Sequence, residues 1–340
     1  MKKRKKNVIW IAACLVIALG LSACGNKESS PSQEASPSAS PSASPSQSAA
    51  SSPSPSASSE AVGDRELTDG LGHQVKIPAN PQRIVASYLE DHLVALGVKP
   101  VAQWSVANGT QDYLKADLDG IPTIPYDLPF ESVMSFQPDL LIIGSAATVE
   151  GDKYDQYAKI APTYVVGDKI NNDWRQSLLK IGEVLGKSDV AEKALADYEA
   201  KAAEAKAKLQ QAAPEQNAAA IWLVSKKFFV VSQNLSSGSV LYQDLGLTVP
   251  KLVQDISKDQ ESNWLPISME QIAQLDVDNL FLINSDADTG SEALQDPLWQ
   301  ALPVVKSGHV YEYPRSSSWL YTGTIANSQI IDDVLESMVK

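Results

Sequence analysis

Six side chains of this sequence have the chemistry to bind an organic ligand, because they are aromatic rings or a guanidinium near the ends of expected strands. They are Tyr88, Trp104, Tyr126, Arg315, Trp319 and Tyr321. Aromatic rings supply flat apolar walls, and an arginine supplies hydrogen bonds and charge. In α/β sheets, ligands bind at the loops beyond the carboxyl ends of the strands. These residues predict a binding cleft.

Each of these side chains also has a purely structural interpretation, and the sequence leaves both open. Trp319 would pack the last helix onto its lobe, Tyr126 would lie in a solvent-exposed loop, and Arg315 would pair with a nearby carboxylate. Trp174 and Trp222 are expected to be structural, since one falls in a helix and the other in an apolar strand.

The composition argues against an enzyme and against a metal centre. A Gly-x-Ser-x-Gly elbow, a Walker loop and a dinucleotide fingerprint are missing from the sequence. The chain has three histidines, and its two cysteines, Cys14 and Cys24, both precede the globular part, so neither a zinc site nor a cofactor is expected. A net charge of −13 is unsuited to nucleic acid.

Two acidic residues recur in matching positions of two similar segments. Phe130–Ile143 aligns with Met269–Leu282 without a gap, and this places Glu131 over Glu270 and Asp139 over Asp278. In each copy the glutamate opens a short helix, and the aspartate leads into a buried strand. The repeat predicts two similar α/β lobes that face each other across a cleft.

One long helix is expected between the two copies. Residues 188–214 carry apolar side chains at three- and four-residue steps, with Ser188 at the start and Pro214 just past the end. At ~1.5 Å per residue the part from Asp189 to Ala212 spans about 36 Å, which is the width of a small domain. It would join the lobes as a rigid rod.

The N-terminal 60 residues predict export and anchoring. Five basic residues and a short apolar run precede Cys24, and Leu21-Ser22-Ala23-Cys24 resembles the lipobox of bacterial lipoproteins, whose cysteine is acylated. Residues 30–60 are nearly all Ser, Pro and Ala, which predicts an extended spacer. We expect a monomer tethered to the outer face of the cytoplasmic membrane, on a Gram-positive cell surface.

The remaining sequence alternates short strands with helices. A β-hairpin is expected over Leu67–Pro78, a strand over Val98–Ala102, and a capping box at Ser268 and Gln271. The alternation predicts mostly parallel sheets. The expected boundaries are 1–23 for the leader, 24–60 for the anchor and spacer, 61–187 for the first lobe, 188–214 for the rod and 215–340 for the second lobe.

Several segments resemble one family, the ABC-transporter solute-binding lipoproteins for iron-siderophores and cobalamin. The matching landmarks are TDGLGHQVKIPANPQRIVAS, ALGVKPVA, FESVMSFQPDLLIIGS, KIGEVLGK, VLYQDLGL and PISMEQIAQLDVDNLFL, in the family's order. The resemblance implies two Rossmann-like lobes joined by one long helix, the class III fold of periplasmic binding proteins. It also implies that Glu131 and Glu270 contact arginines of a membrane permease.

The ligand implied by the resemblance is a ferric siderophore, whose iron is already fully coordinated. A ferric catecholate of charge −3 would need a cluster of Lys or Arg in the cleft, and Arg315 is the clear candidate, with Lys153, Lys226 and Lys227 less certain. A hydroxamate or a citrate-based chelate of low charge fits better. Leu235 and Ser237 stand where hydroxamate-binding relatives often carry Trp and Arg. Cobalamin, haem on Tyr88 or Tyr126, and a cell-surface hydrolase are the alternatives.

Overall fold

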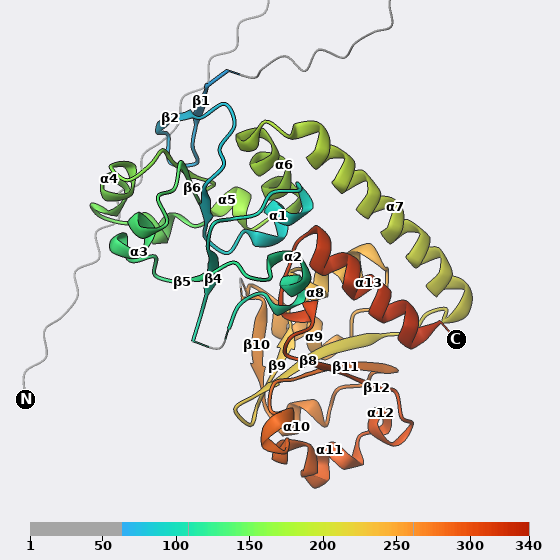
Figure 1. Cartoon of the computed structure of the whole chain (residues 1–340). Coiled ribbons are helices and arrows are strands. Elements are labelled where there is room, and N and C mark those ends of the chain that lie inside the picture. The colour runs from blue at the N-terminus through green and yellow to red at the C-terminus, as the bar shows by residue number, and fades with distance from the viewer. Residues whose placement is uncertain (1–62, 108, 261, 340) are drawn as a thin grey trace, which may run out of the picture. The chain divides into compact units, whose positions relative to one another are not determined.

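The computed structural model describes residues 63–107, 109–260 and 262–339, and these belong to one compact unit (Figure 1). The expected leader, the acylation of Cys24 and the spacer up to residue 60 lie outside the described residues. Within the described part, no helix combines the length and the apolar character that a membrane crossing requires.

The first lobe begins with the expected hairpin, formed by β1 (Arg65–Thr68) and β2 (Gln74–Ile77). The other elements follow in this order: β3 (Ile84–Ala86), α1 (Glu90–Ala95), β4 (Gln103–Ser105), α2 (Lys115–Leu118), β5 (Thr123–Pro125), α3 (Phe130–Ser135), β6 (Leu140–Ile143), α4 (Lys153–Ala158), β7 (Thr163–Val165) and α5 (Asp168–Asn171). Strands β3, β6 and β7 form a parallel sheet, and β4 pairs with β5, also in parallel.

One strand of this lobe was predicted in the wrong place. Residues 98–102 do not form a strand, and β4 starts at Gln103, although Ala102 makes a single bridge to Val85. The N–H of Val98 instead donates to Leu93 O and closes the end of α1, and Pro100 has no N–H to offer to a sheet.

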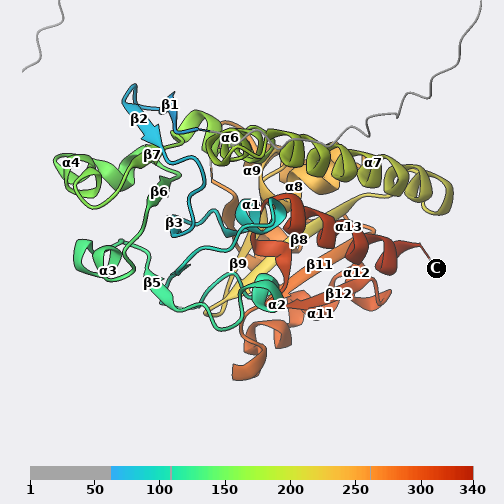
Figure 2. The ribbon, with the colours of Figure 1, turned by 45° about the horizontal axis from the view of Figure 1, so that its top comes forward.

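Alternate residues of the parallel sheet belong to two apolar clusters. Val85, Leu141 and Ile143 pack with residues of α3 and α4, whereas Ile84 and Leu140 pack on the side of α1 and α6. This alternation is what a strand buried on both faces requires. Helices α3 and α4 accordingly lie on the other side of β6 from α6 (Figure 2).

The expected rod is present as α7 (Ser188–Ala212), which follows α6 (Trp174–Leu185). Its buried residues are Ala191, Tyr198, Ala202, Ala205 and Leu209, and their three-, four- and seven-residue spacing forms one apolar stripe. At Gly182 of α6, a Cβ would lie 2.6 Å from the Cβ of Ala191. The two helices therefore pack closely at this point because one residue has no side chain.

The second lobe is built on one five-stranded sheet in the order β10-β9-β8-β11-β12. Its elements are β8 (Ala218–Val224), β9 (Lys227–Val231), α8 (Ser236–Ser239), a π-helical turn (Val240–Asp244), α9 (Lys251–Ser257), β10 (Trp264–Ile267), α10 (Met269–Ile272), β11 (Asn279–Asn284), α11 (Pro297–Ala301), α12 (Pro303–Lys306), β12 (Val310–Pro314) and α13 (Thr324–Met338). The capping box of Ser268 and Gln271 at the start of α10 is confirmed.

The sheet of the second lobe adds an antiparallel part to the expected parallel strands. Strands β8, β11 and β12 run parallel, but β9 and β10 are antiparallel to their neighbours. Strands β8 and β9 are joined by Ser225 and Lys226, whose φ angles are 50° and 61°. Two residues with positive φ make a tight hairpin turn, which leaves no room for a crossover helix.

The aspartates of the sequence repeat have the same structural role in both lobes. Asp139 accepts hydrogen bonds from the N–H groups of Gln82 and Arg83, just before β3. Asp278 accepts one from the N–H of Asn217, just before β8. In each lobe the carboxylate joins the start of one central strand to the start of its parallel neighbour, which explains why both copies need an aspartate there.

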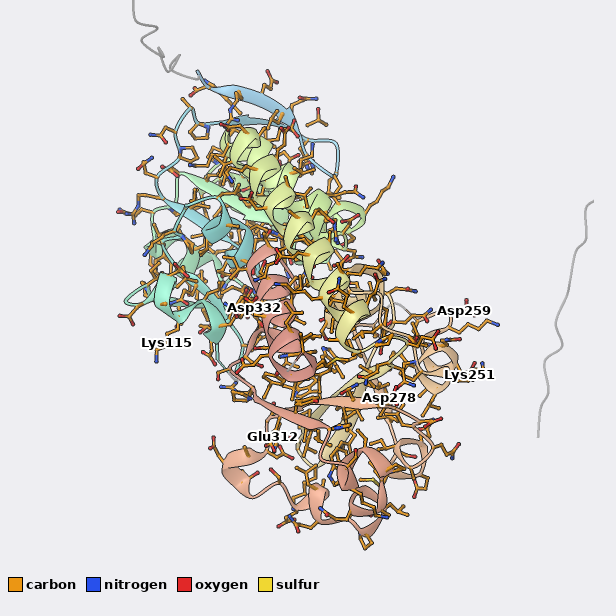
Figure 3. All side chains as sticks on the ribbon, turned by 90° about the vertical axis from the view of Figure 1, so that its right-hand side faces the viewer. Lys115, Lys251, Asp259, Asp278, Glu312 and Asp332 are labelled. Carbon is orange, nitrogen blue, oxygen red and sulfur yellow. The ribbon has the colours of Figure 1, made fainter. Side chains whose placement is uncertain are left out.

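The C-terminal helix connects the second lobe to the first. It packs along α7 and contacts α1 and α6, as Figures 1 and 2 both show. Asp332 of α13, labelled in Figure 3, pairs with Lys201 of α7 at 2.7 Å. The largest apolar cluster contains residues of both lobes, so the lobes share one core although each has its own sheets.

Candidate functional site

A groove of about 870 Å³ lies between the two lobes, which is within the range of small-molecule sites, roughly 300–1,000 Å³. The first lobe contributes the loop after β3, residue 92 of α1 and residues 171–175. The second lobe contributes residues 234–236 after β9 and residues 321–322 before α13, and Glu199 comes from α7. A second hollow, of about 750 Å³, lies beside β9 and β10 and is lined by residues of the second lobe.

A row of aromatic rings, which we call the aromatic row, begins in the groove at Tyr88. The ring of Tyr88 lies 4.6 Å from that of Trp104 and 6.3 Å from that of Tyr321. Tyr126 continues the row at 6.4 Å from Trp104, whose Nε1 donates to the carbonyl of Tyr126. Four of the six predicted ligand-binding residues are thus brought together.

Tyr88 is held in a strained backbone conformation. Its φ angle is 60°, which is unusual for a residue with a bulky side chain. Its side chain is nevertheless 44% exposed, so burial of the ring does not compensate for the strain. Such strain concentrates where a fold must aim a side chain at a ligand.

Arg315 contacts the first lobe rather than lining the groove. Its Nη2 lies 3.5 Å from Asp112 Oδ2, which is the pairing that the sequence left open as an alternative. Near it, the hydroxyl of Tyr321 donates to the carbonyl of Thr110 at 3.1 Å. Both contacts hold residues 109–113 of the first lobe against the second.

Trp319, which was predicted to bind the ligand, lies in the core and not among the residues that line the groove. Its side chain is fully buried, it stacks on Phe281 at 4.7 Å, and its Nε1 donates to Asp333 Oδ2 at 2.8 Å. The ring packs between β11 and α13. This burial fits the structural alternative that the sequence left open, in which Trp319 packs the last helix onto its lobe.

The sequence analysis missed the charged centre of the groove, which is Arg175. Its Nε donates to Glu199 at 2.6 Å, its Nη2 donates to Asp244 at 2.8 Å, and its guanidinium lies 4.4 Å from the ring of Trp174. It thereby connects α6 of the first lobe with α7 and with the second lobe. Its signal in the sequence is the polar run Asn171–Arg175 at the start of the helix, which does not directly follow a strand.

The groove has an excess of negative charge. Asp173, Glu199 and Asp244 line the groove together with one guanidinium, that of Arg175. Burial lowers the pKa of His92 to about 4, so this histidine is neutral at pH 7. Because Arg175 is already paired with two carboxylates, the groove offers little positive charge to an anion.

Leu235 and Ser237 differ in their relation to the groove. Leu235 lines it, whereas Ser237 is fully buried and has no hydrogen-bond partner for its Oγ. Among the described residues, no three His, Cys, Asp or Glu side chains gather in a way that would hold a metal ion.

Glu131 and Glu270 lie in equivalent and exposed positions. Each stands in the first turn of a short helix, α3 or α10, at the amino end of its lobe's repeat. Hydrogen bonds from its own N–H and from Ser268 lower the pKa of Glu270. Both carboxylates are accessible to a partner.

Comparison with known proteins places the chain in a family. The family described as periplasmic binding protein matches residues 86–316. The chain belongs to this family. It is a non-enzymatic, substrate-binding component of the FhuD-type branch, which serves ABC importers of siderophores and iron, and the predicted class III fold is confirmed.

Three relatives illustrate the similarity of this binding protein to known ones. The iron(3+)-hydroxamate-binding protein FhuD of Bacillus subtilis is 30% identical over 273 residues, covering 78% of this chain and 84% of the relative. The probable siderophore-binding lipoprotein YfiY of B. subtilis is 28% identical over 346 residues, covering 97% of each chain. The crystal structure of a FhuD fold-family component of a Fep/Fec-like ferrichrome ABC transporter from B. subtilis has a TM-score of 0.68 at 26% identity and covers 81% of this chain and 100% of its own.

Proposed function

We propose that this protein captures a ferric siderophore in the interlobe groove and delivers it to an ABC permease for iron import. The observation that supports this most is the aromatic row, which reaches the groove at Tyr88 and Tyr321. Flat rings can contact the apolar periphery of an organic chelate, and the chelate itself already satisfies the iron. The relatives named for siderophores and iron(3+)-hydroxamate support the same ligand class.

The charge of the groove favours a chelate that is neutral or positive. Three carboxylates and one paired guanidinium line the groove, so a ligand of charge −3 would be desolvated next to like charges. A ferric hydroxamate meets this requirement best, and a citrate-based chelate meets it only where its net charge is low. Ligand-binding roles are proposed for Tyr88, Trp104, Tyr126 and Tyr321, and Arg315 acts by holding the lobes together.

The exposed pair Glu131 and Glu270 is proposed to dock the loaded protein onto the permease. The two carboxylates are equivalent by the internal repeat, so they would present one negative charge from each lobe to matching cations on the partner. An acylated Cys24, followed by the Ser/Pro/Ala-rich spacer, would keep the protein at the outer face of the cytoplasmic membrane as a monomer. The lipoprotein relative is consistent with this anchoring.

A titration panel tests the ligand. The purified protein is titrated with a positive and a neutral ferric trihydroxamate, ferric citrate, a ferric catecholate of charge −3, cobalamin and haem, while tryptophan fluorescence is recorded. Trp104 in the aromatic row and Trp174 at the groove should report binding by quenching. We expect the hydroxamates to bind below micromolar concentration and the catecholate at least about tenfold more weakly, or 1.4 kcal/mol.

Other outcomes of the panel would redirect the proposal. Tight binding of cobalamin or haem alone would identify the alternative ligand of this fold. A catecholate that binds more tightly than every hydroxamate would contradict the charge argument. If none of the ligands changes the fluorescence, the proposal that the protein binds a siderophore is rejected.

A further inference from the structure

Two adjacent acidic side chains, Glu90 and Asp91, open α1 and are almost completely buried. They are 1% and 2% exposed. Burial raises the pKa of Glu90 to about 7 and that of Asp91 to about 6, although hydrogen bonds from backbone N–H groups oppose the rise. The groups that shift these two pKa values include no lysine or arginine. The cost of burying these two acidic groups must therefore be offset by something other than a basic side chain.

Three short contacts join the two carboxyl groups through Gln111 and Tyr113. The side-chain amide of Gln111 lies 2.7 Å from Glu90 Oε2, its other end lies 2.9 Å from the Tyr113 hydroxyl, and that hydroxyl lies 2.9 Å from Asp91 Oδ2. Gln111 is 5% exposed and borders the groove. We call these four residues the Glu90–Asp91 chain.

The three contacts require three hydrogens, but the two inner residues supply only two. The Gln111 amide donates at one end and accepts at the other, and Tyr113 has a single hydroxyl hydrogen. The third hydrogen must therefore sit on one of the two carboxyl groups. If Gln111 donates to Glu90, the proton is on Asp91, and if the amide is turned by half a turn, the proton is on Glu90.

The surroundings of Asp91 favour its ionised form. Its Oδ1 accepts from the N–H of Ile325 at 3.1 Å, and its Oδ2 accepts from the N–H of Ala326 at 2.9 Å. These groups begin α13, and a helix N-terminus stabilises negative charge. At Gly323, with φ 146°, a Cβ would lie 2.3 Å from the Asp91 carboxyl, so a glycine is needed for this approach.

We propose that the Glu90–Asp91 chain carries one proton at its Glu90 end and that Glu90 is a positioning residue for the groove. Glu90 Oε1 accepts from the backbone N–H of Trp104 at 2.7 Å. Through Gln111 it also holds Tyr113, whose ring lies 4.9 Å from that of Tyr321. One side chain thus fixes both neighbours of Tyr88 in the aromatic row.

Loss of the proton breaks the chain at a defined place. With both carboxylates ionised, Gln111 donates to Glu90 and Tyr113 donates to Asp91, so Gln111 Oε1 and the Tyr113 oxygen face each other without a hydrogen. The other titratable or charged groups near the chain are Tyr88 and His92, then Tyr321 and Asp112 with its partner Arg315, and, along the groove, Asp173 with Arg175. His92 is neutral in this range, as described above, so Glu90 is the group that titrates.

Infrared spectroscopy tests the proton without any ligand. The purified protein should show the carbonyl band of a protonated carboxylic acid that disappears as the pH rises through about 7. Glu90→Gln should lack this band, since the glutamine amide supplies the third hydrogen permanently. Asp333→Asn is the matched control, because burial also raises the pKa of Asp333 to about 6, and the band should persist there.

A second variant tests the hydrogen count if Glu90→Gln does not fold. In Asp91→Asn the new amide donates to Tyr113 and its oxygen still accepts from the N–H of Ile325, while the N–H of Ala326 loses its acceptor. Glu90 then no longer needs its proton. We expect the acid band to move to lower pH. A band that titrates near pH 7 in both variants, or no band in the wild-type protein, would overturn the proposal.

The pH dependence of ligand binding tests the positioning role, and this arm rests on the proposed function. Losing the hydrogen bond between Gln111 and Tyr113 should weaken chelate binding about threefold to tenfold between roughly pH 6 and pH 8. In Glu90→Gln the affinity should no longer change over this pH range. An equal pH dependence in both proteins would overturn the positioning role. If no chelate binds while the infrared result holds, the proposed function fails and the proton assignment stands.

Discussion

Replacing Arg175 by methionine should remove the contacts that its guanidinium makes with three elements of the fold. The side chain connects α6, Glu199 of α7 and Asp244 of the second lobe. Its own side chain is 28% exposed and that of Asp244 is 10% exposed, so this ion pair is largely shielded from water. Methionine keeps most of the apolar stem and removes the charge, so the loss measures the electrostatic contacts.

The expected loss follows from three contacts of unequal strength. The shielded hydrogen bond to Asp244 contributes about 1.5–3 kcal/mol. The Glu199 carboxylate is 48% exposed, so its pairing contributes about 0.5 kcal/mol, and the guanidinium over Trp174 adds about 0.5–1 kcal/mol. Arg175→Met should therefore lower the free energy of unfolding by about 2.5–4.5 kcal/mol.

Urea denaturation at pH 7 measures this loss, and Arg175→Lys is the matched control. An ammonium keeps the charge but cannot bridge two carboxylates in the same geometry, so we expect it to recover about half of the loss. Arg175→Met should also bind a positive ferric chelate more tightly relative to a neutral one, because its groove has lost one positive charge. A loss below about 1 kcal/mol for Arg175→Met would refute the shielded ion pair.

Three further predictions concern the other predicted site residues. Trp104→Ala should weaken chelate binding about tenfold or more in a fluorescence or calorimetric titration, whereas Tyr311→Ala, on β12 away from the groove, should leave it unchanged. Trp319→Ala should lower the free energy of unfolding by about 3–5 kcal/mol, measured by denaturation, while the folded fraction binds the chelate as before. A loss of chelate binding without a loss of stability would indicate that Trp319 contacts the ligand. Glu131→Ala combined with Glu270→Ala should abolish iron uptake by cells and leave the dissociation constant of the chelate unchanged, and weaker binding by the purified double variant would count against docking.

Much of the fold was predictable from local patterns. The hairpin, the capping box and the long helix follow from turn residues and from the spacing of apolar side chains, and the repeat of Glu131 and Glu270 predicted the two lobes. The antiparallel part of the second sheet was missed because the turn at Ser225 and Lys226 contains no Asn-Gly or Asp-Gly signal. Serine and lysine adopt the positive φ angles of this turn, and neither residue type predicts such angles from the sequence.

The candidate site was predictable only in part. Tyr88, Trp104, Tyr126 and Tyr321 follow from their places beside strand ends, and the structure brings them into one row. Trp319 lies in the core, and Arg175, for which the sequence predicted no role, lies in the groove, because the direction of a side chain at a helix start depends on tertiary packing. The Glu90–Asp91 chain joins residues 21 and 22 positions apart and reaches α13, so no local pattern predicts it.

The location of the iron tests the central claim most directly. Crystals of the protein with its tightest ferric siderophore should be measured at the iron absorption edge, where anomalous density marks the metal. The account predicts one strong peak in the interlobe groove, between Tyr88 and Leu235. A peak in the hollow beside Lys226 and Glu292, or a groove without iron at saturating ligand, would contradict it.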